Sequence, residues 1–207
     1  MTDTRFDLEI LKDHYDYIAG IDEVGRGCLF GDVVAACVIM PLDHMIEGIT
    51  DSKKLSPKRR ALYEKAIQSE AVAYSYGRET AQVIDEVNIK QATRRAMKSA
   101  AERVLDQGFR DASVLFLIDA ETIDFELPQK SVVHGDDISY TIACASILAK
   151  EYRDRLCLEW DVIYPGYGIA GHKGYGTKKH REAILELGPS PMHRRSFLTK
   201  ILAGREG

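Results

Sequence analysis

The sequence predicts an α/β fold, a mixed five-stranded sheet flanked by helices, and two kinds of pattern predict it. Short runs of apolar and β-branched residues, typical of buried strands, recur along the chain. Longer stretches with apolar residues at helical spacing separate them. One domain over residues 1–207 is expected, because this length suits a single core. The expected strands are 17–22, 32–40, 71–77, 114–118 and 131–133.

The order of these elements predicts how the strands pair. A short glycine-containing turn joins the first two strands, and the third alternates between apolar and polar residues. We therefore expect the first three strands to form an antiparallel meander. A helix separates the third strand from the fourth, which favours parallel pairing of the fourth strand with the first.

Two helix starts are marked by capping patterns. Ser56 followed by Pro57 is typical of a helix N-terminus. Asn88 with Gln91 resembles a capping box, so we expect a longer helix to begin there and to end near Gly108.

The C-terminal part of the chain is expected to be helical. A helix is predicted over about 138–160 from its apolar stripe, and a Gly- and Tyr-rich loop over 164–176. One or two helices should follow, the last introduced by Ser190 and Pro191. We expect residues 164–207 to form a substrate-binding region within the single domain.

The composition limits the location and the class of protein. No apolar run approaches the roughly 18 residues that a membrane helix needs, and the N-terminus lacks a basic segment followed by an apolar one. The cysteines form no CxxC pair and are interpreted as reduced thiols, so we expect a cytoplasmic protein with no membrane partner. These cysteines are Cys28, Cys37, Cys144 and Cys157.

The charge is distributed unevenly. A net charge of -4 argues weakly against a nucleic-acid partner, because phosphate neutralisation dominates such binding. Lys and Arg are nevertheless concentrated in residues 51–60 and 172–207. These basic zones are compatible with a groove that holds a polyanion beside acidic residues.

Acidic residues close two of the predicted strands. Asp22 and Glu23 follow one apolar run, and Asp119 ends another. If these strands are parallel neighbours, the acids lie at the sheet edge where α/β folds bind ligands. Asp136 follows the fifth strand at a helix start, where Asp137 fits a capping role equally well.

Several converging carboxylates are costly unless divalent cations neutralise them. Oxygen ligands of this kind favour Mg²⁺ or Mn²⁺ over zinc. Two such ions about 4 Å apart support phosphodiester hydrolysis. The three histidines His172, His180 and His193 lack zinc-type spacing and are interpreted as phosphate-side or surface residues.

The turn Gly25, Arg26, Gly27 invites comparison with a dinucleotide-binding loop. That interpretation is disfavoured, because a strand and not a helix follows the turn. A tight hairpin turn is the simpler explanation. Beside Asp22 and Glu23, however, the glycines can bring main-chain groups close to a 2′-hydroxyl, which distinguishes RNA from DNA.

Six motifs together resemble the type 2 ribonucleases H, specifically the ribonuclease HII family. The similarity extends from Tyr17 to Phe197 and implies the ribonuclease H-like fold. It implies that Asp22, Glu23, Asp119 and Asp136 form the metal-binding and catalytic cluster. The motifs, in order, are AGIDEVGRGCLFGDVV, DSKKLSPKRR, LIDA, GDDISYTIACASILAKEYRD, YPGYGIAGHKGYGT and GPSPMHRRSF.

The resemblance also implies how the substrate is held. Residues 25–27 would recognise the 2′-hydroxyl at a junction between ribonucleotide and deoxyribonucleotide, and Tyr175, in preference to Tyr167, would pack on the adjoining deoxyribose. Cys28 and Asp32 depart from the family's usual prolines, so we expect a looser turn and added negative charge near the metals. The residues expected along the nucleic-acid backbone are Lys53, Lys54, Arg194 and Arg195.

The function expected from this resemblance is an endonuclease for RNA/DNA hybrids and for duplex DNA containing ribonucleotides. We expect a monomer, and no peptide tail suited to a sliding clamp follows Phe197. Two alternatives remain, a nuclease for branched or transposon DNA and an RNA/DNA-binding protein without catalysis. Cutting of all-DNA substrate would distinguish the first, and the four acids argue against the second.

Overall fold

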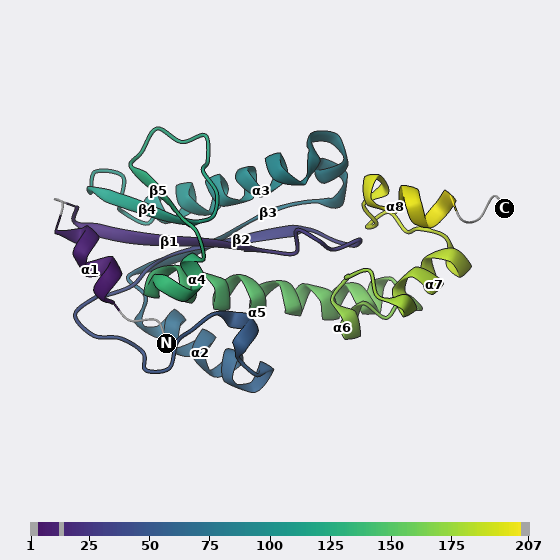
Figure 1. The fold of residues 1–207 in the computed structure, drawn as a ribbon, viewed down its shortest axis with the longest axis horizontal. Helices are drawn as coiled ribbons and strands as arrows, with labels where there is room; N and C mark the ends of the chain where they lie inside the picture. Colours follow the sequence, from purple (N-terminus) through teal and green to yellow (C-terminus); the bar gives the residue numbers. More distant parts are fainter. Residues whose placement is uncertain (1–3, 13–14, 204–207) are drawn as a thin grey trace.

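A five-stranded sheet forms the centre of the computed structural model, which describes residues 4–12 and 15–203. The strand order is β3-β2-β1-β4-β5, in which β1 pairs antiparallel with β2 and parallel with β4 (Figure 1). The antiparallel meander and the mixed sheet are confirmed. The strands are β1 (Tyr17–Val24), β2 (Val33–Ile39), β3 (Ala73–Glu79), β4 (Val114–Asp119) and β5 (Gln129–Val132).

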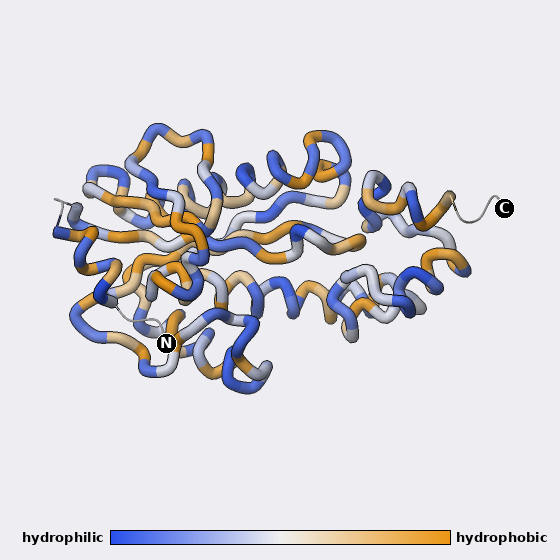
Figure 2. Tube along the Cα trace, viewed as in Figure 1, coloured by the Kyte–Doolittle hydropathy of each residue, from blue (hydrophilic) through white to orange (hydrophobic). Residues whose placement is uncertain are grey.

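Helices cover both faces of this sheet (Figure 1). On one face α3 (Ala81–Leu105) packs against β1, β2 and β3. On the other face α5 (Tyr140–Ile163) packs against β1, β2 and β4, with α2 (Pro57–Glu70) outside it. Apolar residues are concentrated along the strands, as Figure 2 shows, so the two core layers lie on either side of the sheet.

The predicted helix starts are partly right. Ser56 caps α2 as expected, its side chain accepting a hydrogen bond from the backbone N–H of Arg59. Helix α3 begins at Ala81, however, and not at Asn88. Asn88 lies at a kink with φ 68°, where its side chain accepts bonds from the N–H groups of Lys90 and Gln91. It therefore caps the second half of a longer, kinked helix.

The C-terminal helices gather at one end of the molecule, beyond the turn between β1 and β2 (Figure 1). The predicted loop contains a short helix, α6 (Ile169–His172), and α7 (Lys178–Leu187) follows it. The last helix, α8 (Arg195–Leu202), begins after a turn over residues 190–194, so the start predicted at Ser190 is wrong. Three further short elements are α1 (Arg5–Leu11), η1 (Ser52–Lys54) and α4 (Gly135–Ile138).

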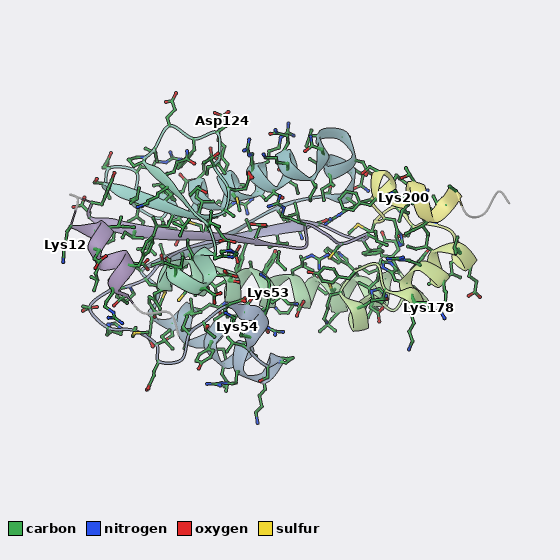
Figure 3. All side chains as sticks on the ribbon, viewed as in Figure 1. Lys12, Lys53, Lys54, Asp124, Lys178 and Lys200 are labelled. Carbon is green, nitrogen blue, oxygen red and sulfur yellow. The ribbon has the colours of Figure 1, made fainter. Side chains whose placement is uncertain are left out.

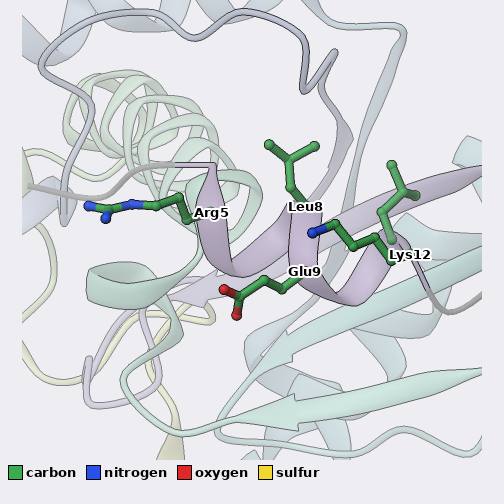
Figure 4. A pocket seen from close by; sticks show the side chains of 5 residues that line it. Arg5, Leu8, Glu9 and Lys12 are labelled. Atoms are coloured by element: carbon green, nitrogen blue, oxygen red, sulfur yellow. The ribbon is translucent and has the colours of Figure 1, made fainter.

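Helix α1, which the sequence patterns did not predict, packs beside the start of β1. A hollow of about 420 Å³ lies against it and is lined by Arg5, Leu8, Glu9, Leu11 and Lys12 (Figure 4). None of the acids that close β1 and β4 lines this hollow. No helix in the described part of the chain is long and apolar enough to span a membrane.

Candidate active site

The pairing of β1 with β4 brings three of the predicted acids to one edge of the sheet. Ile21 is opposite Ile118 in the parallel register, so the next residues, Asp22 and Asp119, leave the two strands side by side. The apolar residues before them are fully buried. The core therefore ends at this point in a row of carboxylates, as the strand-end pattern predicted.

Asp22 and Glu23 are adjacent on a strand and point to opposite faces of the sheet. Asp22 is 5% exposed, and its Oδ1 accepts a bond of 2.7 Å from the backbone N–H of Glu23. Burial raises its pKa well above the ordinary value, and the charges of Glu23 and Asp119 raise it further. Ser146 of α5 hydrogen-bonds the Asp22 carboxyl group and opposes this shift.

Glu23 keeps one carboxylate oxygen without a partner. Its Oε1 accepts a bond of 3.2 Å from Arg26, whereas Oε2 is buried and has no hydrogen-bond partner. Burial raises the pKa of Glu23, Arg26 lowers it and the charge of Asp119 raises it. An unpaired buried carboxylate oxygen is costly, so this atom is well suited to a cation.

Asp119 connects the strand-end acids with the acids of α4. Its Oδ1 accepts a bond of 2.7 Å from the backbone N–H of Gly135. Burial raises the pKa of Asp119, the Gly135 N–H lowers it, and the charge of Asp136 raises it. Asp136 therefore lies within electrostatic reach of the cluster.

The structure distinguishes Asp136 from its neighbour Asp137. Asp136 is buried, 7% exposed, and lies 3.4 Å from Lys53 Nζ. Asp137 is exposed, and its pKa is lowered by an ion pair with Lys54. The N-cap position belongs to His134, which has no side-chain capping bond, so neither aspartate caps α4. Of the two, Asp136 is the one whose charge raises the pKa of Asp119.

These four acids fit a hard divalent cation. All their donors are oxygen, Arg26 and Lys53 offset part of their charge, and one buried oxygen is unpaired. Within residues 4–12 and 15–203, no three His, Cys, Asp or Glu side chains already converge on a single ion position. Binding would therefore require these side chains to turn towards a common point.

The loop between β1 and β2 lies next to Glu23. Gly25 has φ +91°, and a Cβ there would lie 2.3 Å from Nε of Arg153, so only glycine fits. Gly27 differs, because it is exposed and a Cβ added there would meet no neighbouring atom within 4 Å. Space beside Gly27 is open to a ligand.

Two buried arginines hold this loop by its carbonyl oxygens. Arg194 is fully buried, and its Nε and Nη1 donate to the carbonyls of Gly31 and Arg26 at 2.9 Å each. Arg153 donates in the same way to Phe30 and Asp32 at 3.0 Å. The expectation that Arg194 lies along a nucleic-acid backbone is therefore wrong, because its side chain is inside the protein.

Arg195, the next residue, is exposed. Its backbone N–H donates to Asp85, and its guanidinium donates to the carbonyl of Pro189 at 3.3 Å. Lys53 and Lys54 are also exposed and lie together near the middle of the molecule, whereas Lys178 and Lys200 lie at the C-terminal end (Figure 3). Cationic side chains therefore lie beside the acids and at the C-terminal end of the molecule.

Tyr175 is brought against the same loop. It forms an antiparallel backbone bridge with Cys28 and is 44% exposed. The Tyr167 hydroxyl instead donates to the carbonyl of Gly188 at 2.6 Å, and its ring packs near Phe30. Only Tyr175 of these two tyrosines lies beside residues 25–27.

The unusual residues Cys28 and Asp32 are both buried within the loop, and the looser turn stays a prediction. Cys28 is fully buried, and its Sγ donates to the carbonyl of Lys173 at 3.5 Å. Asp32 is buried, which raises its pKa, while Arg78, Arg153 and Arg194 lower it. Its negative charge therefore faces arginines rather than the acids of the cluster.

The interpretation of the histidines as phosphate-side or surface residues is wrong for two of them. His180 and His193 are buried and contact each other. Sequence reasoning also missed Arg153, which lies in the motif SILAKEYRD without a pattern that marks it as buried. Ser146, beside Asp22, was missed because it lies within an apolar helical run.

Comparison with known proteins agrees with this geometry. The family model described as ribonuclease HII matches residues 19–200. The ribonuclease HII of Alkaliphilus metalliredigens is 53% identical, over 98% of this chain and 100% of its own. That of Alkaliphilus oremlandii is 54% identical, over 91% of this chain and 93% of its own.

Solved structures share the fold at lower identity. The ribonuclease H2 of Pyrococcus horikoshii has a TM-score of 0.69 at 22% identity, over 92% of this chain and 100% of its own. A ribonuclease HIII crystallised with Mn²⁺ has a TM-score of 0.69 at 16% identity, over 90% of this chain and 69% of its own. These likenesses confirm the ribonuclease H-like fold. From the matched length and the identity to its relatives, the chain belongs to the ribonuclease HII family.

Proposed function

We propose that this chain is an endonuclease that hydrolyses the RNA strand of RNA/DNA hybrids and nicks duplex DNA on the 5′ side of embedded ribonucleotides. The products would carry 5′-phosphate and 3′-hydroxyl ends. The observation that supports this most strongly is the juxtaposition of the buried acids with the loop of residues 25–27 and Tyr175. A cluster suited to phosphodiester chemistry thus adjoins a surface suited to sugar recognition.

The acids Asp22, Glu23, Asp119 and Asp136 would hold Mg²⁺ or Mn²⁺, with two ions proposed. When bound, such ions activate water and stabilise the leaving oxygen. The protein's part is to gather the four carboxyl groups at one edge of the sheet, where bound ions would favour their ionised form. Lys53, 3.4 Å from Asp136, offsets part of the negative charge that would otherwise repel a phosphate.

Recognition of RNA would come from the loop of residues 25–27. Backbone groups near Gly27 can approach a sugar closely, because no side chain or neighbouring atom blocks them. A 2′-hydroxyl both donates and accepts hydrogen bonds, so backbone groups can select it. Tyr175, half-exposed beside Cys28, offers a ring face to a deoxyribose on the other side of the junction.

Basic side chains would track the phosphate backbone on both sides of the cut. Lys53 and Lys54 lie next to the acids, and Arg195 is in the C-terminal region 164–207, which we propose contacts the duplex. Arg194 is assigned a different role, holding the loop in place from the inside. Phosphate contacts of this kind position the duplex without reading its sequence.

The biological role we propose is removal of ribonucleotides from DNA by a monomeric, cytoplasmic enzyme. The four cysteines are all free and buried, which suits a reducing compartment. A nuclease for branched DNA would have the same acids, but it would not need the open loop and the tyrosine beside them. A non-catalytic binding protein would not need four carboxyl groups at one edge of the sheet.

The test is cleavage of three duplexes by the wild type and by Asp22→Asn. The duplexes are DNA with one ribonucleotide, an RNA/DNA hybrid and all-DNA, each with Mg²⁺, Mn²⁺ or chelator. We expect cutting of the first two only, requiring metal, and a loss of roughly 10³-fold in the variant. Cutting of all-DNA, or undiminished cutting by the variant, would contradict the proposal.

A further inference from the structure

Two buried histidines connect the turn before α8 with the backbone of Tyr175. His193 Nε2 lies 3.2 Å from His180 Nε2. At the other side of each ring, His193 Nδ1 is 3.0 Å from the backbone nitrogen of Ser190, and His180 Nδ1 is 2.9 Å from the carbonyl oxygen of Tyr175. The two rings therefore form one continuous hydrogen-bonded path from Ser190 to Tyr175.

The direction of this path follows from its ends. A backbone N–H can only donate, so His193 Nδ1 accepts from the Ser190 N–H. The Ser190 hydroxyl lies 2.9 Å from the same nitrogen and accepts from the Met192 N–H, so its own proton is directed to Nδ1 as well. The His193 proton is therefore on Nε2. That N–H donates to His180 Nε2, which leaves the His180 proton on Nδ1. His180 Nδ1–H then donates to the Tyr175 carbonyl, which is an acceptor only. Each ring is thus a single, neutral tautomer.

The surroundings favour the neutral rings. Burial lowers the pKa of His180 to about 4 and that of His193 to about 3, although backbone hydrogen bonds with Tyr175 and Ser190 oppose these shifts. The charge of Arg195 lowers the pKa of His193 further. A second proton on His180 would sit on Nε2 and face the His193 Nε2–H at the 3.2 Å contact. A second proton on His193 would sit on Nδ1 and face the Ser190 N–H at 3.0 Å. The path is therefore intact throughout the neutral pH range.

The same turn also contacts the loop between β1 and β2. The His193 ring packs edge-on against Phe30 at 4.8 Å between centroids, and the carbonyl of Met192 accepts from Gly31 N–H at 2.8 Å. Tyr175 in turn forms a backbone bridge with Cys28. One turn thus sets the position of the loop through direct contacts and that of Tyr175 through the histidines.

We propose that His193 and His180 are positioning residues that hold Tyr175 in register with the loop of residues 25–27. They would thereby set the preference for a ribonucleotide next to deoxyribose. This inference rests on the proposed function, in which Tyr175 contacts the deoxyribose. Neither histidine touches the substrate in this scheme, and the effect passes through the Tyr175 backbone.

Two substitutions at His193 separate hydrogen bonding from packing. His193→Phe keeps a ring against Phe30 and loses the donor to His180. His193→Gln loses the ring and keeps an amide donor near the Nε2 position. A merely structural role predicts that Phe is the milder change, whereas the positioning role predicts that Gln is. Thermal unfolding of both variants establishes that they are folded.

The readout is the ratio of kcat/KM for DNA with one ribonucleotide to kcat/KM for an RNA/DNA hybrid, whose cut strand offers Tyr175 no deoxyribose. We expect His193→Phe to lower this ratio by roughly fivefold, as for loss of one positioning hydrogen bond. His193→Gln should stay within about twofold of the wild type. In a Tyr175→Ala background, His193→Phe should have no further effect on the ratio.

The outcomes separate the two proposals. If Tyr175→Ala leaves the ratio unchanged, the proposed role of Tyr175 fails, and this inference fails with it. If Tyr175→Ala lowers the ratio and His193→Phe does not, only the histidine proposal is overturned. Ring ¹⁵N shifts of the metal-free protein give an independent readout, expected to show Nε2–H at His193 and Nδ1–H at His180. Protonation of either ring between pH 6 and 8 would contradict the path.

Discussion

The carboxylate edge of β1 and the loop that follows it bury charge in opposite ways. At the edge, burial and the charges of Glu23 and Asp119 raise the pKa of Asp22, and Glu23 Oε2 has no hydrogen-bond partner. In the loop, the cations Arg153 and Arg194 donate to a series of backbone carbonyls. The edge thus leaves a buried carboxylate oxygen unpaired, whereas the loop is stabilised mainly by the protein itself. In the function we propose, chemistry belongs to the edge and recognition to the loop.

The largest effect on stability is expected in the loop. Arg194→Met would leave the buried carbonyls of Gly31 and Arg26 without their donors, which costs about 1–3 kcal/mol for each. The matched change Arg195→Met, at an exposed position, should cost about 0.5 kcal/mol or less. Urea denaturation of both variants measures the difference. Equal loss at the two positions would mean that the loop does not depend on Arg194.

A smaller effect is expected from the lysines beside the acids. Lys53→Ala should lower kcat/KM by about tenfold. It should also reduce the slope of log binding constant against log salt concentration by about 1, the amount expected for one phosphate contact. Lys54→Ala should act more weakly, because Lys54 pairs with the exposed Asp137 and not with Asp136. Cleavage and binding at several salt concentrations test this order. A stronger effect at Lys54 would reverse the assignment.

The smallest expected effect is on the pH dependence of stability without metal. The folded state raises the pKa of Asp22 above its ordinary 3.8, so it retains a proton that the unfolded chain releases. Stability is therefore lost as pH rises from about 4 through the raised pKa. Asp22→Asn should flatten this decline, because it removes the titrating group. Thermal unfolding from pH 4 to 8 in chelator measures this decline for the wild type and the variant. Parallel curves of unfolding temperature against pH for the two proteins would contradict the prediction.

Strand-end acids could be predicted from the sequence because β1 and β4 are strongly apolar until they end. Asp22, Glu23 and Asp119 interrupt that pattern, and parallel pairing then places them together. The sequence pattern could not show which of Asp136 and Asp137 is buried, because the two are adjacent on a helix of only four residues.

Buried polar residues escaped the same reasoning. Arg194 and Arg195 are identical in type and adjacent, yet one holds the loop and the other faces solvent. No sequence spacing marks His180 and His193 as a pair, because their contact depends on how α7 packs against the turn that follows it. Local patterns report which face of an element is apolar, and they do not report tertiary hydrogen bonds.

The contrast between the carboxylate edge and the loop is tested most directly by an unfolding temperature. It is measured for the wild type and for Asp22→Asn at pH 8, with chelator or with Mn²⁺. The variant retains the oxygen that accepts from Glu23 N–H and loses only the charge. In chelator, Asp22→Asn should unfold at least about 2 °C above the wild type, because it removes about 1 kcal/mol of repulsion between the carboxylates. Mn²⁺ near 100 times its Kd should raise the wild type by about 5–10 °C and the variant much less. Equal responses of the two proteins to Mn²⁺, or a less stable variant in chelator, would contradict a metal site at these acids.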